Sequence, residues 1–172
     1  MNRLIAAFFI LCSSHLLATP DIHFSKDCAH AGFDFQEGDI SFFNLNLDLD
    51  SDKKVKNRLC EIAVKFPANK GQRLVVSQFQ VEAFAQLERR GVALLSLEHN
   101  LNDQWRRRSD DRAVKPGAKS LLVSDKILQK MPCGKSAWLK TNIITAVRNG
   151  VLFQDNAIQV IKLNYHYENC KW

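Results

Sequence analysis

The sequence lacks the short motifs that identify many enzymes and metal proteins. It contains no Gly-x-Ser-x-Gly elbow, no Cys-x-x-Cys pair and no two histidines at metal-ligand spacing. These absences argue against a serine hydrolase of the elbow type and against a common zinc site. No Asn-x-Ser/Thr acceptor is present, so nothing points to N-glycosylation. We therefore expect no cofactor and no metal ion, and the sequence identifies no catalytic residue.

The chain also lacks a hydrophobic run long enough to cross a membrane, so we expect no transmembrane segment. Residues 1–18 carry one charge, Arg3, followed by an apolar stretch that ends at Cys12, which is typical of a secretory signal peptide. We expect residues 19–172 to form a single secreted or periplasmic domain. The alternative is lipidation of Cys12, but Leu11 stands where a lipobox has a small residue.

Four cysteines remain after the signal peptide, namely Cys28, Cys60, Cys133 and Cys170. An even number of cysteines in an exported protein favours disulfides over zinc ligation. Three pairings are possible in principle. Pairing in sequence order closes the shortest loops, so we predict Cys28–Cys60 and Cys133–Cys170. Two such bridges would stabilise each half of the domain by about 3 to 4 kcal/mol on the chain-entropy model.

Apolar and polar residues alternate with period two through most of the chain, which indicates strands with one buried face. The sequence predicts an all-β fold, an antiparallel β-sandwich of about six to nine strands. The expected strands cover residues 43–50, 59–66, 74–85, 91–97, 121–123, 139–147 and 158–167. The tail at 81–90 is also compatible with a helix, the polar segment 102–119 reads as a long surface loop, and Asn149–Gly150 is a hairpin signal.

The alternation also predicts which side chains form the core. These are the apolar residues on one face of each expected strand: Phe43, Leu45, Leu47, Ile62, Val64, Phe66, Phe79, Val81, Leu95, Leu97, Ile143, Ile161, Leu163 and Tyr165.

Cysteine, glycine and aromatic positions recur in a recognisable order along the chain. They are Cys28 with Gly32, Asp39 before Phe42–Phe43, Arg58–Cys60 with Pro67 and Gly71, Phe84–Leu87 with Gly91, Cys133–Gly134, Leu139, Asn142 and Cys170. In this order the chain resembles the domain of unknown function 4360 family of small exported proteins, over most of residues 19–172. The resemblance implies export and a β-sandwich. It implies no activity, because the family has no established one.

One stretch stands out as a candidate contact for a partner. Trp105 is followed by Arg106, Arg107 and Arg108, and three guanidinium groups beside an indole suit an anionic or aromatic ligand. The formal net charge of +6 also favours anionic surfaces. The alternative is a solvated loop whose arginines are neutralised by nearby aspartates.

Two functions remain open from the sequence. The first is an exported binding module that contacts an extracellular or envelope protein or an acidic glycan, for example as a hydrolase inhibitor or an envelope-associated factor. Nucleic acid is not an expected partner. The second is a secreted hydrolase using carboxylates in a cleft, drawn from Asp39, Asp48, Glu61 or Glu98. A calcium site at Asp48 and its neighbouring aspartates lacks a glycine-centred loop, so a solvated strand edge is the preferred interpretation.

Overall fold

The computed structural model describes residues 19–28, 30–36, 38–103, 105–153 and 161–171. In this part of the chain the structure is antiparallel β-sheet with one short 3-10 turn, η1 (Lys26–Cys28), and no α-helix. No helix long and apolar enough to span a membrane occurs among these residues. The strands are β1 (Asp21–Phe24), β2 (Gly32–Gln36), β3 (Asp39–Phe43), β4 (Leu49–Ser51), β5 (Lys56–Phe66), β6 (Gln72–Leu101), β7 (Trp105–Ala113), β8 (Gly117–Lys130), β9 (Ala137–Phe153) and β10 (Lys162–Asn169).

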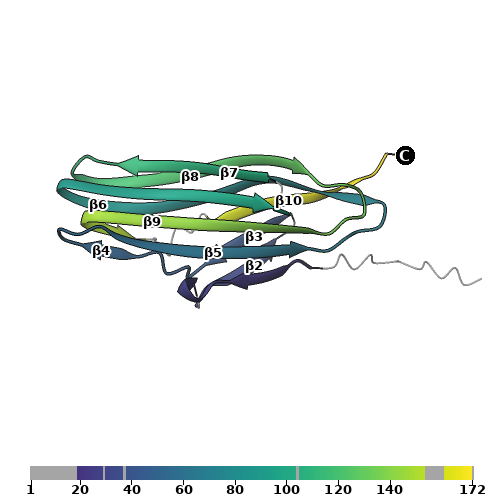
Figure 1. Cartoon of the computed structure of the whole chain (residues 1–172), viewed down its shortest axis with the longest axis horizontal. Helices are drawn as coiled ribbons and strands as arrows, with labels where there is room; N and C mark the ends of the chain where they lie inside the picture. The colour runs from purple at the N-terminus through teal and green to yellow at the C-terminus, as the bar shows by residue number, and fades with distance from the viewer. Residues whose placement is uncertain (1–18, 29, 37, 104, 154–160, 172) are drawn as a thin grey trace, which may run out of the picture.

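Strand β6 is 30 residues long and folds back on itself. The ring of Phe79 in its first half lies 5.2 Å from the ring of His99 in its second half. A straight strand would separate these two residues by about 65 Å, so β6 must reverse between them. The reversal lies between Leu87 and Val92, where pairing with β9 jumps from Gly150 to Arg148. Figure 1 shows the ribbon of β6 curling over at the left end of the molecule.

The reversal converts one ten-stranded sheet into two facing layers. Layer A contains β1, β5, β9, the second half of β6, and β7 in that order. Layer B contains β2, β3, β10, the first half of β6, and β8. The end of β9 crosses over to pair with residues 84–87 of β6, and β4 pairs with the same end of β9.

Two glycines allow the backbones to approach closely at the reversal. A Cβ on Gly91 would lie 2.5 Å from the carbonyl oxygen of Asn149, and a Cβ on Gly150 would lie 2.5 Å from that of Gln86. Contacts this short are forbidden by steric overlap, so both positions require glycine. The left-handed backbone of Arg90, with a φ of 65°, completes the turn.

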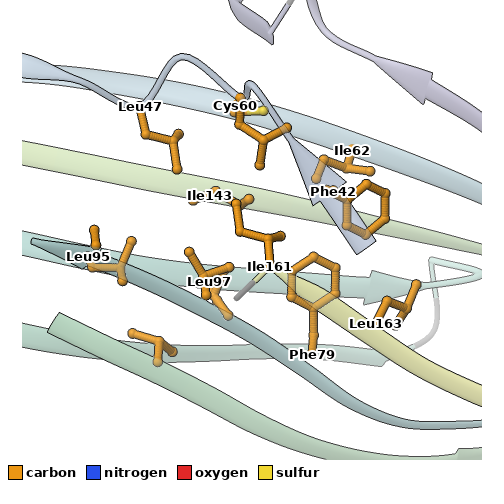
Figure 2. Close-up of a cluster of buried hydrophobic side chains, with 14 of the residues drawn as sticks. Phe42, Leu47, Cys60, Ile62, Phe79, Leu95, Leu97, Ile143, Ile161 and Leu163 are labelled. Carbon is orange, nitrogen blue, oxygen red and sulfur yellow. The ribbon is translucent and has the colours of Figure 1, made fainter. Parts of the chain in front are cut away.

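The space between the layers is filled by the apolar faces of both (Figure 2). Alternation correctly predicted twelve of the fourteen core residues, which are buried. The exceptions, Phe43 and Tyr165, are half-buried. In β3 the buried ring is Phe42, stacked on Phe79 at 5.9 Å. Asn44 and Asn46 adopt positive φ, so the expected strand at 43–50 is wrong: β3 ends at Phe43 and β4 begins at Leu49.

The structure corrects two further expectations and decides one alternative that the sequence left open. The segment at 102–119 is not a long surface loop, because β7 and the start of β8 occupy most of it. Residues 81–90 are strand, which excludes the helical alternative. Asn149–Gly150 is not a hairpin turn; β9 runs through it as an irregularity opposite the reversal of β6. The closing strand begins at Lys162, and residues 158–160 of the expected strand lie outside the described residues.

Two disulfides connect the segments that the sequence order predicted. Cys28 bonds to Cys60 and so fixes η1 to β5. Cys133 bonds to Cys170 and so fixes the β8–β9 turn to the C-terminal end of β10. The all-β fold with two bridges is confirmed; it has ten strands, where six to nine were expected.

A polar cluster joins the two layers inside this core. His99 and Asp125 are fully buried, and His99 Nδ1 lies 3.0 Å from Thr141 Oγ1. Asp125 belongs to β8 of layer B, and its Oδ1 forms an ion pair with Nε of Arg107 in layer A at 2.8 Å. Burial lowers the pKa of His99 to about 4, outweighing the opposing effect of Asp125, and Arg107 lowers it further. His99 is therefore neutral at physiological pH.

This neutral histidine predicts a pH-dependent stability. The unfolded chain binds a proton as pH falls through about 6.5, whereas folded His99 does so only near 4. Stability should thus be complete above 6.5 and decline toward 4, with a loss of about 2 kcal/mol between pH 7 and pH 5. Guanidinium unfolding at the two pH values would measure this loss. His99→Gln should remove most of it, and the exposed His166→Gln control should keep it; equal slopes in all three proteins would contradict the assignment.

Candidate functional site

The outer face of layer A carries a polar groove next to an aromatic ring. Two adjoining hollows, of about 250 and 540 Å³, share Asn100 and Lys140. The groove is lined by side chains of β5, β9, β6, β7 and the β6–β7 turn: Glu61, Glu98, Asn100, Asn102, Asp103, Arg106, Trp138, Lys140 and Asn142. We call this set the polar groove.

Strand pairing brings these residues together from four separate segments. Asn142 of β9 pairs with Glu61 on one side and with Glu98 on the other. Two residues further along β6, Asn100 pairs with Lys140 of β9 and with Arg106 of β7. Side chains two residues apart on a strand point to the same face, so all of them project from layer A away from the core.

Trp138 forms one end of the polar groove and is held from the β5 side. Lys65 Nζ lies 5.5 Å from the centre of the indole ring, and the His23 ring is stacked at 6.0 Å. On the β6 side, the backbone N–H of Trp138 donates to Asn102 Oδ1 at 2.6 Å. Because β9 lies between β5 and β6, the side of the indole toward Asn100 and Asn102 lines the groove.

Two amide oxygens in the polar groove have no hydrogen-bond donor among the described residues. They are Oδ1 of Asn100 and Oδ1 of Asn142, and both are buried from solvent. The Asn100 side chain is oriented by its Nδ2, which donates to Asp103 Oδ1 at 3.1 Å. A buried acceptor without a donor is costly, so each oxygen would gain a hydrogen bond if its amide side chain turned toward a ligand hydroxyl or N–H in the groove.

The structure brings together two of the four candidate carboxylates. Glu61 and Glu98 line the same hollow on either side of Asn142. Strand spacing places their backbones about 10 Å apart. Asp39 lies in layer B, where its Oδ1 accepts from Asn164 at 2.5 Å, and Asp48 lies between β3 and β4.

The arginine run does not form one cluster, because β7 is a strand and its side chains alternate. Arg106 reaches the polar groove. Arg107 points the other way and binds Asp125 and the carbonyl oxygen of Lys126, the latter at 3.2 Å. Arg108 Nε pairs with Asp110 Oδ1 at 3.1 Å. The side chain of Trp105 lies outside the described residues.

The polar groove has nearly balanced charge. Glu61, Glu98 and Asp103 contribute negative charge, and Arg106 and Lys140 contribute positive charge. Lys140 Nζ also lies 3.9 Å from Asp103 Oδ1. Among the described residues no group of three or more His, Cys, Asp or Glu side chains is placed to hold a metal ion.

Sequence reasoning missed Trp138, Asn100 and Asn142. The signal for Asn142 was present, because predicting Ile143 as inward-facing implies that Asn142 faces outward. Extending the same alternation by one residue before the strand expected at 139–147 places Trp138 on that outer face as well. Nothing in the sequence shows that β5, β9 and β6 are neighbours, and the site depends on that order.

Comparisons with known proteins leave the chain without an assigned family. No model of a known protein family matches it, and no curated protein does. The resemblance to the domain of unknown function 4360 family therefore stays a prediction. A structure of TmCBM61 in complex with beta-1,4-galactotriose is 12% identical over 89% of this chain and 90% of that chain, with a TM-score of 0.31.

A second solved structure matches a shorter part of the chain. The enzymatically active domain of bacteriophage CBA120 tailspike protein 4 is 10% identical over 62% of this chain and 18% of that chain, with a TM-score of 0.23. Both TM-scores are too low to support an argument about either fold or function.

The opposite directions of Arg106 and Arg107 predict different effects of their removal. Arg107→Ala should lower the free energy of unfolding by about 1 to 3 kcal/mol, because buried Asp125 loses its guanidinium partner. Arg106→Ala, on the outer face, should change it by about 0.5 kcal/mol or less. Chemical denaturation of the two variants measures the difference, and equal stabilities would contradict the placement of Arg107.

Proposed function

We propose that the protein is a disulfide-stabilised binding module whose polar groove binds an uncharged or weakly charged oligosaccharide. The observation that carries the proposal is the juxtaposition of the Trp138 ring with the unpaired amide oxygens of Asn100 and Asn142. An indole face packs against the C–H groups of a sugar ring, and the amide oxygens accept hydrogen bonds from its hydroxyls.

The charge balance of the polar groove favours this ligand over a polyanion. Arg106 is accompanied in its hollow by Glu61 and Glu98, which would repel sulfate, phosphate or uronate groups. Paired carboxylates and cations in one groove instead offer both acceptors and donors to neutral hydroxyls. We therefore propose a neutral glycan as the ligand, in place of the acidic glycan expected from the arginine run.

The structural framework suits recognition outside the cytosol. The two disulfides persist in an oxidising compartment, and we propose secretion or periplasmic localisation on that ground. The polar groove lies on paired strands of layer A, so its side chains are held in place before a ligand arrives. Membership of the domain of unknown function 4360 family is compatible with this role.

Removing the ring tests the binding proposal. Affinity electrophoresis in gels containing xylan, galactan, β-glucan or dextran would identify a retarding polysaccharide, and calorimetry with its oligomers would give the affinity. Trp138→Ala should weaken binding about tenfold or more, because ring stacking is lost. Phe84→Ala, an aromatic substitution on layer B, should leave the affinity unchanged. Failure of every neutral glycan to bind, or equal binding by Trp138→Ala, would contradict the proposal.

A second candidate function is glycoside hydrolysis, favoured by Glu61 and Glu98 in one hollow. Their backbone separation of about 10 Å is compatible with the carboxyl spacing of inverting glycosidases. If this is correct, the bound polysaccharide should yield new reducing ends, and Glu61→Gln or Glu98→Gln should abolish that release. Binding without any release of reducing ends would leave the binding module as the function.

A further inference from the structure

Four segments that are far apart in the sequence meet at the end of the molecule where β6 reverses. These are the β4–β5 turn, the reversal of β6, the β7–β8 connection and the irregularity of β9 (Figure 1, left end). The side-chain amide of Asn149 donates to the carbonyl oxygen of Arg90 at 3.4 Å, which links two of them. This end lies away from Trp138, which is next to the β8–β9 turn.

Positive charge is concentrated at this end. Segments 50–56, 88–91, 112–116 and 148–149 contain three acidic residues, Asp50, Asp52 and Glu88, against eight basic ones. The eight basic residues are Lys53, Lys54, Lys56, Arg89, Arg90, Arg112, Lys115 and Arg148. We call the surface that they form the basic end. The surplus of five positive charges is almost the whole formal net charge of +6.

Apolar side chains lie among these charges rather than apart from them. Val55 is 65% exposed in the β4–β5 turn, and Val114 is 54% exposed in the β7–β8 connection. Beside Val55, an open apolar groove of about 350 Å³ is lined by Val92 and Leu94. Arg112 and Arg148 flank the same groove.

We propose that the basic end docks on the surface of an anionic lipid bilayer, with Val55 and Val114 inserted between the headgroups. Charge complementarity identifies the occupant, because the basic residues surround the apolar tips on a protruding end and would meet the headgroup phosphates as the valines enter the interface. A soluble polyanion would satisfy the charges but not the exposed valines. The proposal is independent of the polar groove.

Vesicle binding tests the proposal directly. The oxidised protein would be sedimented with vesicles of phosphatidylcholine alone and with vesicles of phosphatidylcholine and phosphatidylglycerol. We expect binding only to the mixed vesicles, with an affinity that falls as salt rises. Reversing Lys53, Lys54 and Lys115 to glutamate should weaken binding about a hundredfold or more. Reversing Lys126 of β8 and Lys162 of β10, both exposed on the outer face of layer B, should have a much smaller effect.

The valines separate a membrane from a soluble polyanion. Val55→Ser with Val114→Ser should weaken vesicle binding severalfold and leave retention on heparin unchanged, whereas Leu128→Ser, a 69% exposed residue of β8, should alter neither. Folding of each variant is checked by its unfolding transition. Absence of binding to the mixed vesicles, or vesicle binding that is indifferent to the double valine substitution, would overturn the proposal.

Discussion

The close approach of two backbones at Gly91 and Gly150 is the constraint on which the architecture depends. It lets a 30-residue strand reverse while its partner β9 crosses from one layer to the other. The two halves of β6 then face each other across the core, so that β7 and β8 become the edge strands of opposite layers. The apolar faces meet in one core, and the Phe79–His99 contact is the direct consequence.

The same reversal separates two surfaces with different chemistry. On the outer face of layer A, strand pairing assembles the polar groove from β5, β9, β6 and β7. At the reversal itself, four connections bring their lysines and arginines to one end. A protein with these two surfaces could hold an oligosaccharide at a membrane, with the disulfides maintaining the framework between them.

Period-two alternation predicted β5, both halves of β6, β9 and β10, and cysteine order predicted both disulfides. Alternation did not reveal β7, because the inward positions of this edge strand include the charged residues Arg107 and Asp111. Arg107 binds Asp125 of layer B, and Asp111 accepts a hydrogen bond from the backbone N–H of Leu122. Such a strand has no apolar face to recognise. The hairpin predicted at Asn149–Gly150 was also wrong, because the sequence does not distinguish a glycine required by close backbone packing from one required by a turn.

The polar groove was beyond sequence reasoning because its residues share a face only after the strand order is known. The three consecutive arginines were predicted to form one binding site because they are contiguous in the sequence. In β7 their side chains instead alternate between the two faces of the strand. Both surfaces therefore depend on the reversal of β6. A nuclear Overhauser spectrum of the oxidised protein tests this reversal directly: because the two rings lie 5.2 Å apart, cross-peaks are expected between the ring protons of Phe79 and the imidazole protons of His99. Absence of these cross-peaks, with both rings assigned, would contradict the two-layer fold and the surfaces derived from it.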